Sequence, residues 1–264
     1  MGISNVKEGY GKEKATKLLE KMIELQANYP DSYVYAESYA IIRAYIDYQK
    51  SQNTNVSHIE KTLSYFNFPL MYCDAGVKYI KKNELLKGTV CNFKDLVTSK
   101  HSMRKSSDLP ITEKEMKDAI SLTCTAPSAC NRQPCKIYYS LETDKNISMS
   151  KLVPGNKLFY EDIKYYCLVT ADKSLFGGSE SYQWYLNSGI FISYFTLALH
   201  SLGIGSCIFQ WPDYYEKEKE MRQLIGEISN EESIVAVIGY GHYPNELKCI
   251  SAQRKPIEEI AKKF

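Results

Sequence analysis

The chain has 264 residues, 44% of them hydrophobic and 24% charged, and a formal net charge of +2. This composition is typical of a globular protein, and the length allows one domain with appendages or two small domains. The mixed charges argue against a nucleic-acid surface. The start of the chain shows no apolar secretory segment, so we expect a cytoplasmic protein.

The first part of the chain is predicted to be helical. Apolar residues recur at helical spacing over Lys14 to Leu25, which favours an amphipathic helix. Pro30 interrupts this pattern, and Asp31 is a candidate N-cap for a second helix over Tyr33 to Gln52.

A third helix and a linker follow. Ser57-His58-Ile59-Glu60 fits a capping box, which predicts a helix that ends near Phe66. A polar segment from Lys81 to Lys94 then leads into the rest of the chain. We find no chemical motif in residues 1–92, so we predict a helical N-terminal extension there and a second domain over residues 93–264.

The second part of the chain alternates helices with strands. Thr112-Glu113-Lys114-Glu115 is another capping box, for a helix that ends near Thr123, and further helices are predicted over Tyr182–Leu202 and Glu216–Ile228. Runs of β-branched and aromatic residues predict strands over Lys136–Leu141, Tyr165–Thr170 and Ile234–Tyr240. Strands that alternate with helices normally suggest a parallel sheet.

The longest apolar run, Ile190 to Ile208, is interrupted by polar residues and glycines, among them His200 and Gly205. It therefore favours a buried helix followed by a strand over a membrane span. The eight cysteines form no CxxC pair and have no histidine cluster beside them, so we expect free thiols and no metal site.

Two segments carry the chemistry that the sequence offers. Lys100-His101-Ser102-Met103-Arg104 places two fixed positive charges, an imidazole and a hydroxyl within five residues, which suits a phosphate. The segment from Ala126 to Cys135, APSACNRQPC, combines small residues with the amides of Asn131 and Gln133. Small residues allow close approach of a backbone, and amides can read a heteroaromatic edge. A flat polar heterocycle with a phosphate, such as FMN, fits both segments.

These segments resemble the two signature blocks of the nitroreductase family, flavoenzymes that usually read R-[RH]-S-x-[RK] and A-P-S-[SA]-x-N-x-Q-P-W. The chain departs from this pattern at Lys100, where the family has arginine, and at Cys135, where it commonly has tryptophan. Leu202 to Phe209 resembles the family's L-G-[LI]-G-[ST]-C segment beside the flavin ring. Gln253-Arg254-Lys255-Pro256 resembles its C-terminal basic pair, which returns to the phosphate.

The resemblance implies an α+β fold with a mixed, mainly antiparallel sheet flanked by helices, in an obligate homodimer that binds FMN. It also implies the residues that bind the cofactor. The phosphate side would be held by Lys100, His101, Ser102, Arg104 and Arg254. One face of the ring would be held by Pro127, Ser128, Asn131 and Gln133, and the other by Ile208, Phe209 and Gln210, where a backbone N–H would donate to the flavin N5.

The function that the resemblance implies is two-electron reduction of a small conjugated acceptor of the nitro, quinone or enone type. NAD(P)H would reduce FMN, leave, and be replaced by the acceptor in a ping-pong cycle. Because the cofactor carries this chemistry, no catalytic side chain is expected. Two alternatives stay open: a specialised flavin dehydrogenase or reductive dehalogenase of a biosynthetic intermediate, and a non-catalytic FMN-binding module whose helical extension docks a partner.

Two other classes of enzyme find no support. Gly203-Ile204-Gly205 lies between a predicted helix and a predicted strand, whereas the dinucleotide fingerprint needs a strand, three glycines and then a helix. We find no Ser-His-Asp order, paired-carboxylate signature or HExxH motif, so hydrolytic chemistry is not indicated.

Overall fold

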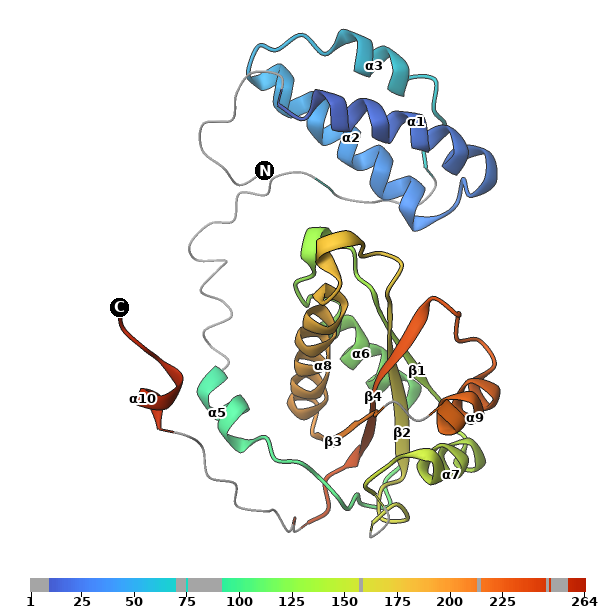
Figure 1. Cartoon of the computed structure of the whole chain (residues 1–264), viewed down its shortest axis with the longest axis vertical. Helices are drawn as coiled ribbons and strands as arrows, with labels where there is room; N and C mark the ends of the chain where they lie inside the picture. Colours follow the sequence, from blue (N-terminus) through green and yellow to red (C-terminus); the bar gives the residue numbers. More distant parts are fainter. Residues whose placement is uncertain are drawn as a thin grey trace. The chain divides into compact units, whose positions relative to one another are not determined.

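The structure of the protein is a computed structural model, which describes residues 10–69, 75, 92–156, 159–212, 215–245, 247 and 256–264. The chain divides into two compact units, residues 1–90 and residues 91–264 (Figure 1). Each unit has a hydrophobic core of its own. None of the described helices is long and apolar enough to cross a membrane.

The described residues of the first unit form three helices, close to the ranges that the sequence predicted. These are α1 (Lys12–Asn28), α2 (Tyr33–Ser51) and α3 (Ser57–Leu63). Their apolar faces meet in one core, whose members include Leu19 and Met22 of α1, Ile42 of α2 and Ile59 of α3. The N-terminal extension is therefore helical, as predicted.

Two predicted helix starts are wrong in detail. Ser32, not Asp31, is the N-cap of α2, and its hydroxyl oxygen accepts the N–H of Tyr35 at 3.2 Å. The predicted capping box at Ser57 is absent, because Ser57 is already the first residue of α3 and its N–H donates to the side chain of Asn55 at 3.0 Å. Glu60, the expected partner in that box, instead forms an ion pair with Lys50 of α2.

A four-stranded sheet forms the centre of the second unit. Its strands are β1 (Cys135–Tyr139), β2 (Tyr165–Asp172), β3 (Ile204–Gln210) and β4 (Glu232–His242). They lie in the order β1-β2-β4-β3, and every neighbouring pair is antiparallel (Figure 1). A parallel bridge joins Ser102 to Ser206 outside these strands. The mixed, mainly antiparallel sheet that the family resemblance implied is confirmed. The parallel sheet that the alternation of helices and strands would suggest is not formed by the described strands.

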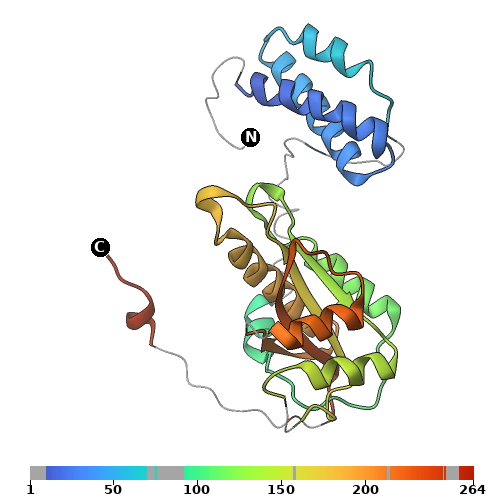
Figure 2. The same ribbon diagram turned by 45° about the vertical axis from the view of Figure 1, so that its right-hand side comes forward.

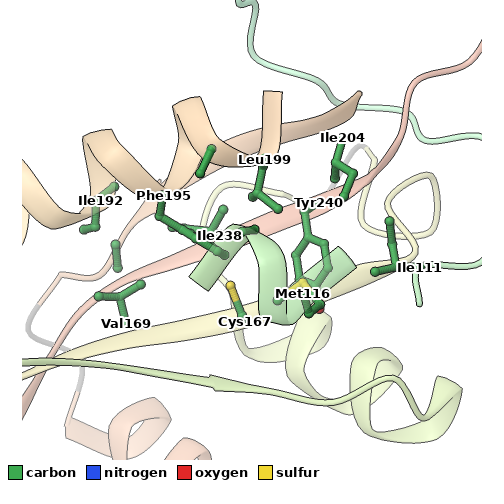
Figure 3. Packing of buried hydrophobic residues seen from close by; sticks show 13 residues of the cluster. Ile111, Met116, Cys167, Val169, Ile192, Phe195, Leu199, Ile204, Ile238 and Tyr240 are labelled. Carbon is green, nitrogen blue, oxygen red and sulfur yellow. The ribbon is translucent and has the colours of Figure 1, made fainter. Parts of the chain in front are cut away.

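Helices pack on both faces of this sheet (Figure 2). α6 (Glu113–Thr123) and α8 (Gln183–Ser201) pack on one face, and α7 (Thr143–Leu152) and α9 (Tyr215–Ile225) on the other. Alternate residues of β2 enter the two cores: Cys167 and Val169 face α6 and α8, and Tyr166 and Leu168 face α7 and α9. Figure 3 shows the first of these cores, with Phe195 of α8 against the sheet.

Local signals predicted some of these elements and missed others. The capping box of α6 is present: the Thr112 hydroxyl accepts the Glu115 N–H at 3.2 Å, and the Glu115 carboxylate accepts the Thr112 N–H at 2.8 Å. α7 escaped prediction because its sequence, TDKNISMSKL, is mostly polar and shows no apolar stripe. Four short helical segments among the described residues were also not predicted: α5 (Phe93–Ser99), α10 (Ile257–Ile260) and the 3-10 turns η2 (Ala129–Asn131) and η3 (Gly178–Glu180).

Candidate functional site

The segment Lys100–Arg104, here called the cationic segment, runs beside the outer edge of β3. Ser102 forms a parallel bridge with Ser206, and the Met103 N–H donates to the Ser206 carbonyl at 2.9 Å. Met103 is fully buried, whereas Ser102 is exposed. The backbone pairing and the buried methionine together fix this segment on the sheet.

The two cations of the segment lie near the same residue of β3. Burial raises the pKa of the Cys207 thiol, and the positive charges of Arg104 and Lys100 oppose that rise. Burial also lowers the pKa of Lys100. Neither cation forms an ion pair with any carboxylate among the described residues. A partly buried cation without a carboxylate is stabilised by an anionic ligand.

His101 is exposed, and its Nδ1 lies 2.8 Å from the carbonyl oxygen of Ser99, the last residue of α5. The carbonyl can only accept, so Nδ1 carries the hydrogen. The imidazole is therefore turned back toward the end of α5, and its other nitrogen is the one that could reach a ligand.

Gly205 explains why the cationic segment can lie so close to β3. A Cβ atom at this position would lie 2.4 Å from Sδ of Met103 and 2.7 Å from Cε1 of Tyr243. Both distances are far below van der Waals contact, so any other residue would displace one of these side chains. The glycine of the predicted L-G-I-G-S-C segment thus makes room for protein side chains.

The second predicted segment, Pro127–Gln133, here called the loop segment, precedes β1 and contains the 3-10 turn η2 (Ala129–Asn131). Cys130, Asn131 and Gln133 all have positive φ, at 53°, 56° and 47°. Such conformations are unfavourable for residues other than glycine and persist only where neighbours hold them. Here the Ser128 hydroxyl accepts the Gln133 N–H at 2.9 Å, and the Gln133 amide donates to the Asn131 side chain at 3.2 Å.

Two side-chain contacts tie the loop segment to its surroundings. The Ala129 N–H donates to the Asn187 side chain of α8 at 2.8 Å. Arg132 forms an ion pair with Glu180 of η3 at 2.8 Å and lies 5.0 Å from the ring of Phe176. Arg132 lies in the recognised block, but its charge is compensated within the protein.

A cavity of roughly 400 Å³ opens beside the loop segment. Its lining comes from the loop, β1, α6 and α8, and includes Pro127, Gln133, Cys135, Ile137 and Phe191. Cys135, which stands where the family commonly has tryptophan, places its thiol 3.6 Å from the Ser188 hydroxyl. Burial raises the pKa of this thiol, so it is not an activated nucleophile.

The three predicted ring residues of β3 do not face the same side. Ile208 and Gln210 are exposed. Phe209 lies in the core on the opposite face, where its ring stacks on Phe159 with the centroids 5.9 Å apart. Only the backbone of Phe209 is therefore left for a ligand on the side of Ile208.

Within one chain the cationic and loop segments lie apart. They flank opposite edges of the sheet, because β1 is one edge strand and β3 is the other. They also meet opposite ends of α8: the loop contacts Asn187, and Ser99 contacts His200. These two contacts are roughly 20 Å apart along the helix at its usual rise per residue. Arg254, the remaining predicted phosphate ligand, lies outside the described residues.

Sequence reasoning missed two polar groups near these segments. His200 of α8 hydrogen-bonds both Ser99 and Tyr243, and its only signal was a lone imidazole in an apolar helix. Glu232 is 1% exposed, and its carboxylate accepts from Lys136 at 2.6 Å and from Thr170 and Tyr138. This buried network joins β1, which follows the loop segment, to β2 and β4.

The donor set fits the phosphate of FMN. Lysine, arginine, serine and an imidazole suit a phosphate, and the cations here lack carboxylate partners among the described residues. At the loop segment, exposed Pro127 and the amides of Asn131 and Gln133 suit a flat ring with polar edges. The two halves could hold one FMN only if something brings them together.

The fold of the second unit is similar to that of known proteins. Residues 151–242 match the model of the nitroreductase family. A nitroreductase family protein from Streptococcus pneumoniae is similar in structure, with 22% identity and a TM-score of 0.55 over 66% of this chain and 100% of that one. An FMN-dependent nitroreductase from Clostridium difficile has 21% identity and a TM-score of 0.52 over 60% of this chain and 91% of that one.

A third similar structure, from Desulfovibrio desulfuricans, is assigned as a nitroreductase and was solved in complex with FMN. It has 18% identity and a TM-score of 0.55, over 66% of this chain and 96% of that one. No curated protein matches the chain in sequence. At these identities the structural likeness shows the fold, and the family model adds the sequence match. Together they show a match to the nitroreductase family over residues 151–242, within a unit that has the fold of nitroreductases, and a helical N-terminal region in addition.

Proposed function

We propose that the protein is an FMN-dependent oxidoreductase that uses NAD(P)H to reduce a small conjugated acceptor of the nitro, quinone or enone type. The observation that carries this proposal is the pair Lys100 and Arg104, two cations held against β3 with no carboxylate partner among the described residues. The family match and the FMN-bound neighbour support the same ligand. Bound FMN would supply the hydride chemistry.

The proposed roles of the residues follow from their positions. Lys100, His101, Ser102 and Arg104 would bind the phosphate, with Arg254. Pro127, Ser128, Asn131 and Gln133 would contact one side of the ring, and Ile208 and Gln210 the other, with the backbone of Phe209. In this proposal residues 93–264 form the FMN-binding domain and residues 1–92 an extension.

A homodimer would bring the two halves of the site together. Both faces of the sheet between its two edges are covered by helices, so one chain cannot place one FMN against both segments. If α8 packs antiparallel against the α8 of a second copy, the start of each helix lies beside the end of the other. The loop segment of one copy would then lie beside the cationic segment of its partner.

The composition of α8 supports such a dimer. The helix is apolar on all sides, which is typical of a buried helix. Yet Tyr182, the N-cap residue, and Tyr185 and Leu186 of the first turn are exposed on one side of the helix, with Tyr182 at 81%. Exposed aromatic and aliphatic side chains on one helix face favour an interface with another protein surface. An isologous C2 contact would cover this face in both copies.

The first experiment is an absorbance spectrum of the purified protein, with the released chromophore identified by mass. We expect flavin bands, FMN at one per chain, and steady NAD(P)H oxidation with a quinone or nitroarene. In the double variant Arg104→Ala, Arg254→Ala, FMN should be lost while the fold remains. Stoichiometric FMN in that variant would contradict the phosphate assignment. Tightly bound FMN without turnover would instead identify a non-catalytic flavin-binding module.

A further inference from the structure

The end of α8 is connected to the end of α5 through one imidazole. Nε2 of His200 lies 2.9 Å from the Ser99 hydroxyl, and Nδ1 lies 2.9 Å from the Tyr243 hydroxyl. The rings of His200 and Tyr243 also meet edge to face, with centroids 5.7 Å apart. His200 therefore joins three parts of the fold: α5, α8 and the chain after β4.

The hydrogen positions in this chain of contacts follow from counting donors. The Ser99 hydroxyl has one hydrogen, which it donates to the Asp95 carbonyl at 2.6 Å. Toward His200 it must then accept, so Nε2 carries the hydrogen of the imidazole. Nδ1 of the neutral ring accepts from the Tyr243 hydroxyl. Burial, Lys100 and His101 together lower the pKa of His200, which favours this neutral form.

The cationic segment is anchored to the fold near both of its ends, and one of the two anchors is the contact with His200. At one end, Met103 pairs with Ser206 on β3. At the other end, Ser99 is held by His200, and its carbonyl in turn holds the His101 imidazole. Only three residues separate the two anchors, and two of them are Lys100 and His101.

α5 has little else to hold it in place. The helix is seven residues long and has no buried residue. Among the residues that the structure describes, the Ser99–His200 contact is the one side-chain hydrogen bond that links α5 to another element. Tyr243, at the far side of His200, is itself fixed, because its ring lies against Gly205 of β3.

We propose that His200 is a positioning residue for the phosphate end of the FMN site, acting through Ser99 on the backbone that carries Lys100 and His101. The inference rests on the proposed function. It makes His200 important for the phosphate and unimportant for the flavin ring, because its side-chain hydrogen bonds reach Ser99, directly before the cationic segment, and Tyr243, and none of the residues proposed to hold the ring.

Riboflavin separates these two effects, since it has the ring of FMN without the phosphate. The quantity to measure is the ratio of the riboflavin Kd to the FMN Kd, by titrating flavin-free full-length protein and following flavin fluorescence. In His200→Leu we expect the FMN Kd to rise about tenfold, the effect of one misplaced charged contact, and the riboflavin Kd to stay constant. His200→Gln keeps an N–H toward Ser99 and should restore most of the ratio.

A matched pair on α5 tests the path from His200 to the segment. Ser99→Ala removes the hydroxyl that meets His200, and we expect it to lower the ratio as His200→Leu does. Thr98→Val removes the neighbouring hydroxyl, which donates only to the Lys94 carbonyl, and should leave the ratio unchanged. This pair also replaces His200→Leu if that variant does not fold.

The outcomes separate this inference from the proposed function. If the wild-type protein binds neither FMN nor riboflavin, the proposed function fails. If it prefers FMN and both His200→Leu and Ser99→Ala keep that preference, His200 does not position the phosphate site. An equal loss of FMN and riboflavin binding in these variants would mean that His200 supports the fold only, and would also overturn the inference.

Discussion

The cationic segment and the loop segment are both parts of the proposed FMN site, but they are built in opposite ways. The cationic segment is held by backbone pairing to β3 and by buried Met103, and its two cations have no carboxylate partner among the described residues, although Arg104 lies 6.0 Å from the centre of the Phe159 ring. The loop segment is held by its own side chains, with Ser128 bonded to Gln133 and Arg132 paired with Glu180. One segment therefore offers side-chain charge to a ligand, whereas the other offers a shaped backbone. Substitutions in the two should have different signatures.

The largest effect is expected from Gly205→Val, which removes the space on which the cationic segment depends. The new side chain would collide with Met103 and Tyr243, and overpacking of this kind costs about 3 kcal/mol of unfolding free energy. FMN should be lost at the same time. Urea unfolding and flavin content measure the two effects. Gly177→Ala is the control, because a Cβ there meets nothing within 4 Å; an equal loss in the control would contradict the explanation.

Glu232→Gln should destabilise β1, which follows the loop segment, and leave the cationic segment unchanged. The carboxylate is buried but its partner Lys136 is half exposed, so we expect a loss of about 2 kcal/mol of unfolding free energy at pH 7. The riboflavin-to-FMN ratio should not change, because the network lies on the side of β1.

The stabilisation by Glu232 should also depend on pH. Burial alone would raise the pKa of this carboxyl, but hydrogen bonds from Lys136, Thr170 and Tyr138 outweigh burial and hold the pKa below its usual value. The unfolded state then takes up the proton more readily as the pH falls. The wild-type protein should exceed Glu232→Gln in unfolding free energy by the full amount above about pH 4.3. This difference in unfolding free energy should shrink as the pH falls through the lower pKa of the folded state. A difference that stays constant down to pH 3 would refute this.

Arg104→Ala should act on the ligand and hardly on the fold. Losing one charge-assisted contact costs about 1.5 to 3 kcal/mol, so the FMN Kd should rise ten- to a hundredfold, with the riboflavin Kd unchanged. Titrations with both flavins give the result directly. A parallel rise in both constants would show that Arg104 does not contact the phosphate.

Arg132→Ala should lower stability slightly and leave FMN binding unchanged, the opposite of the effects expected for Arg104→Ala. Its pair with Glu180 is partly exposed, and such pairs contribute little to stability because solvent screens the charges. We expect a small drop in thermal stability and no change in the riboflavin-to-FMN ratio. Selective loss of FMN in this variant would mean that Arg132 binds the phosphate after all, and the contrast between the segments would disappear.

Local sequence signals predicted much of this fold. Apolar spacing placed α1, the break at Pro30 separated it from α2, a long apolar run placed α8, and Thr112 with Glu115 placed the start of α6. The same reasoning misplaced the cap of α2 by one residue and missed polar α7, where a few contacts with the sheet outweigh weak local preference.

The sequence by itself determined which residues we propose for flavin binding: the cations of the first segment, the amides and small residues of the second, and the segment of β3 that follows the glycines. Only the tertiary structure decided how they are used. In the folded chain Arg132 forms an ion pair with Glu180, and Met103 and Tyr243 lie over Gly205. The two segments lie at opposite ends of α8. These relations join residues far apart along the chain, and they depend on which surfaces pack together, a choice that no local pattern encodes.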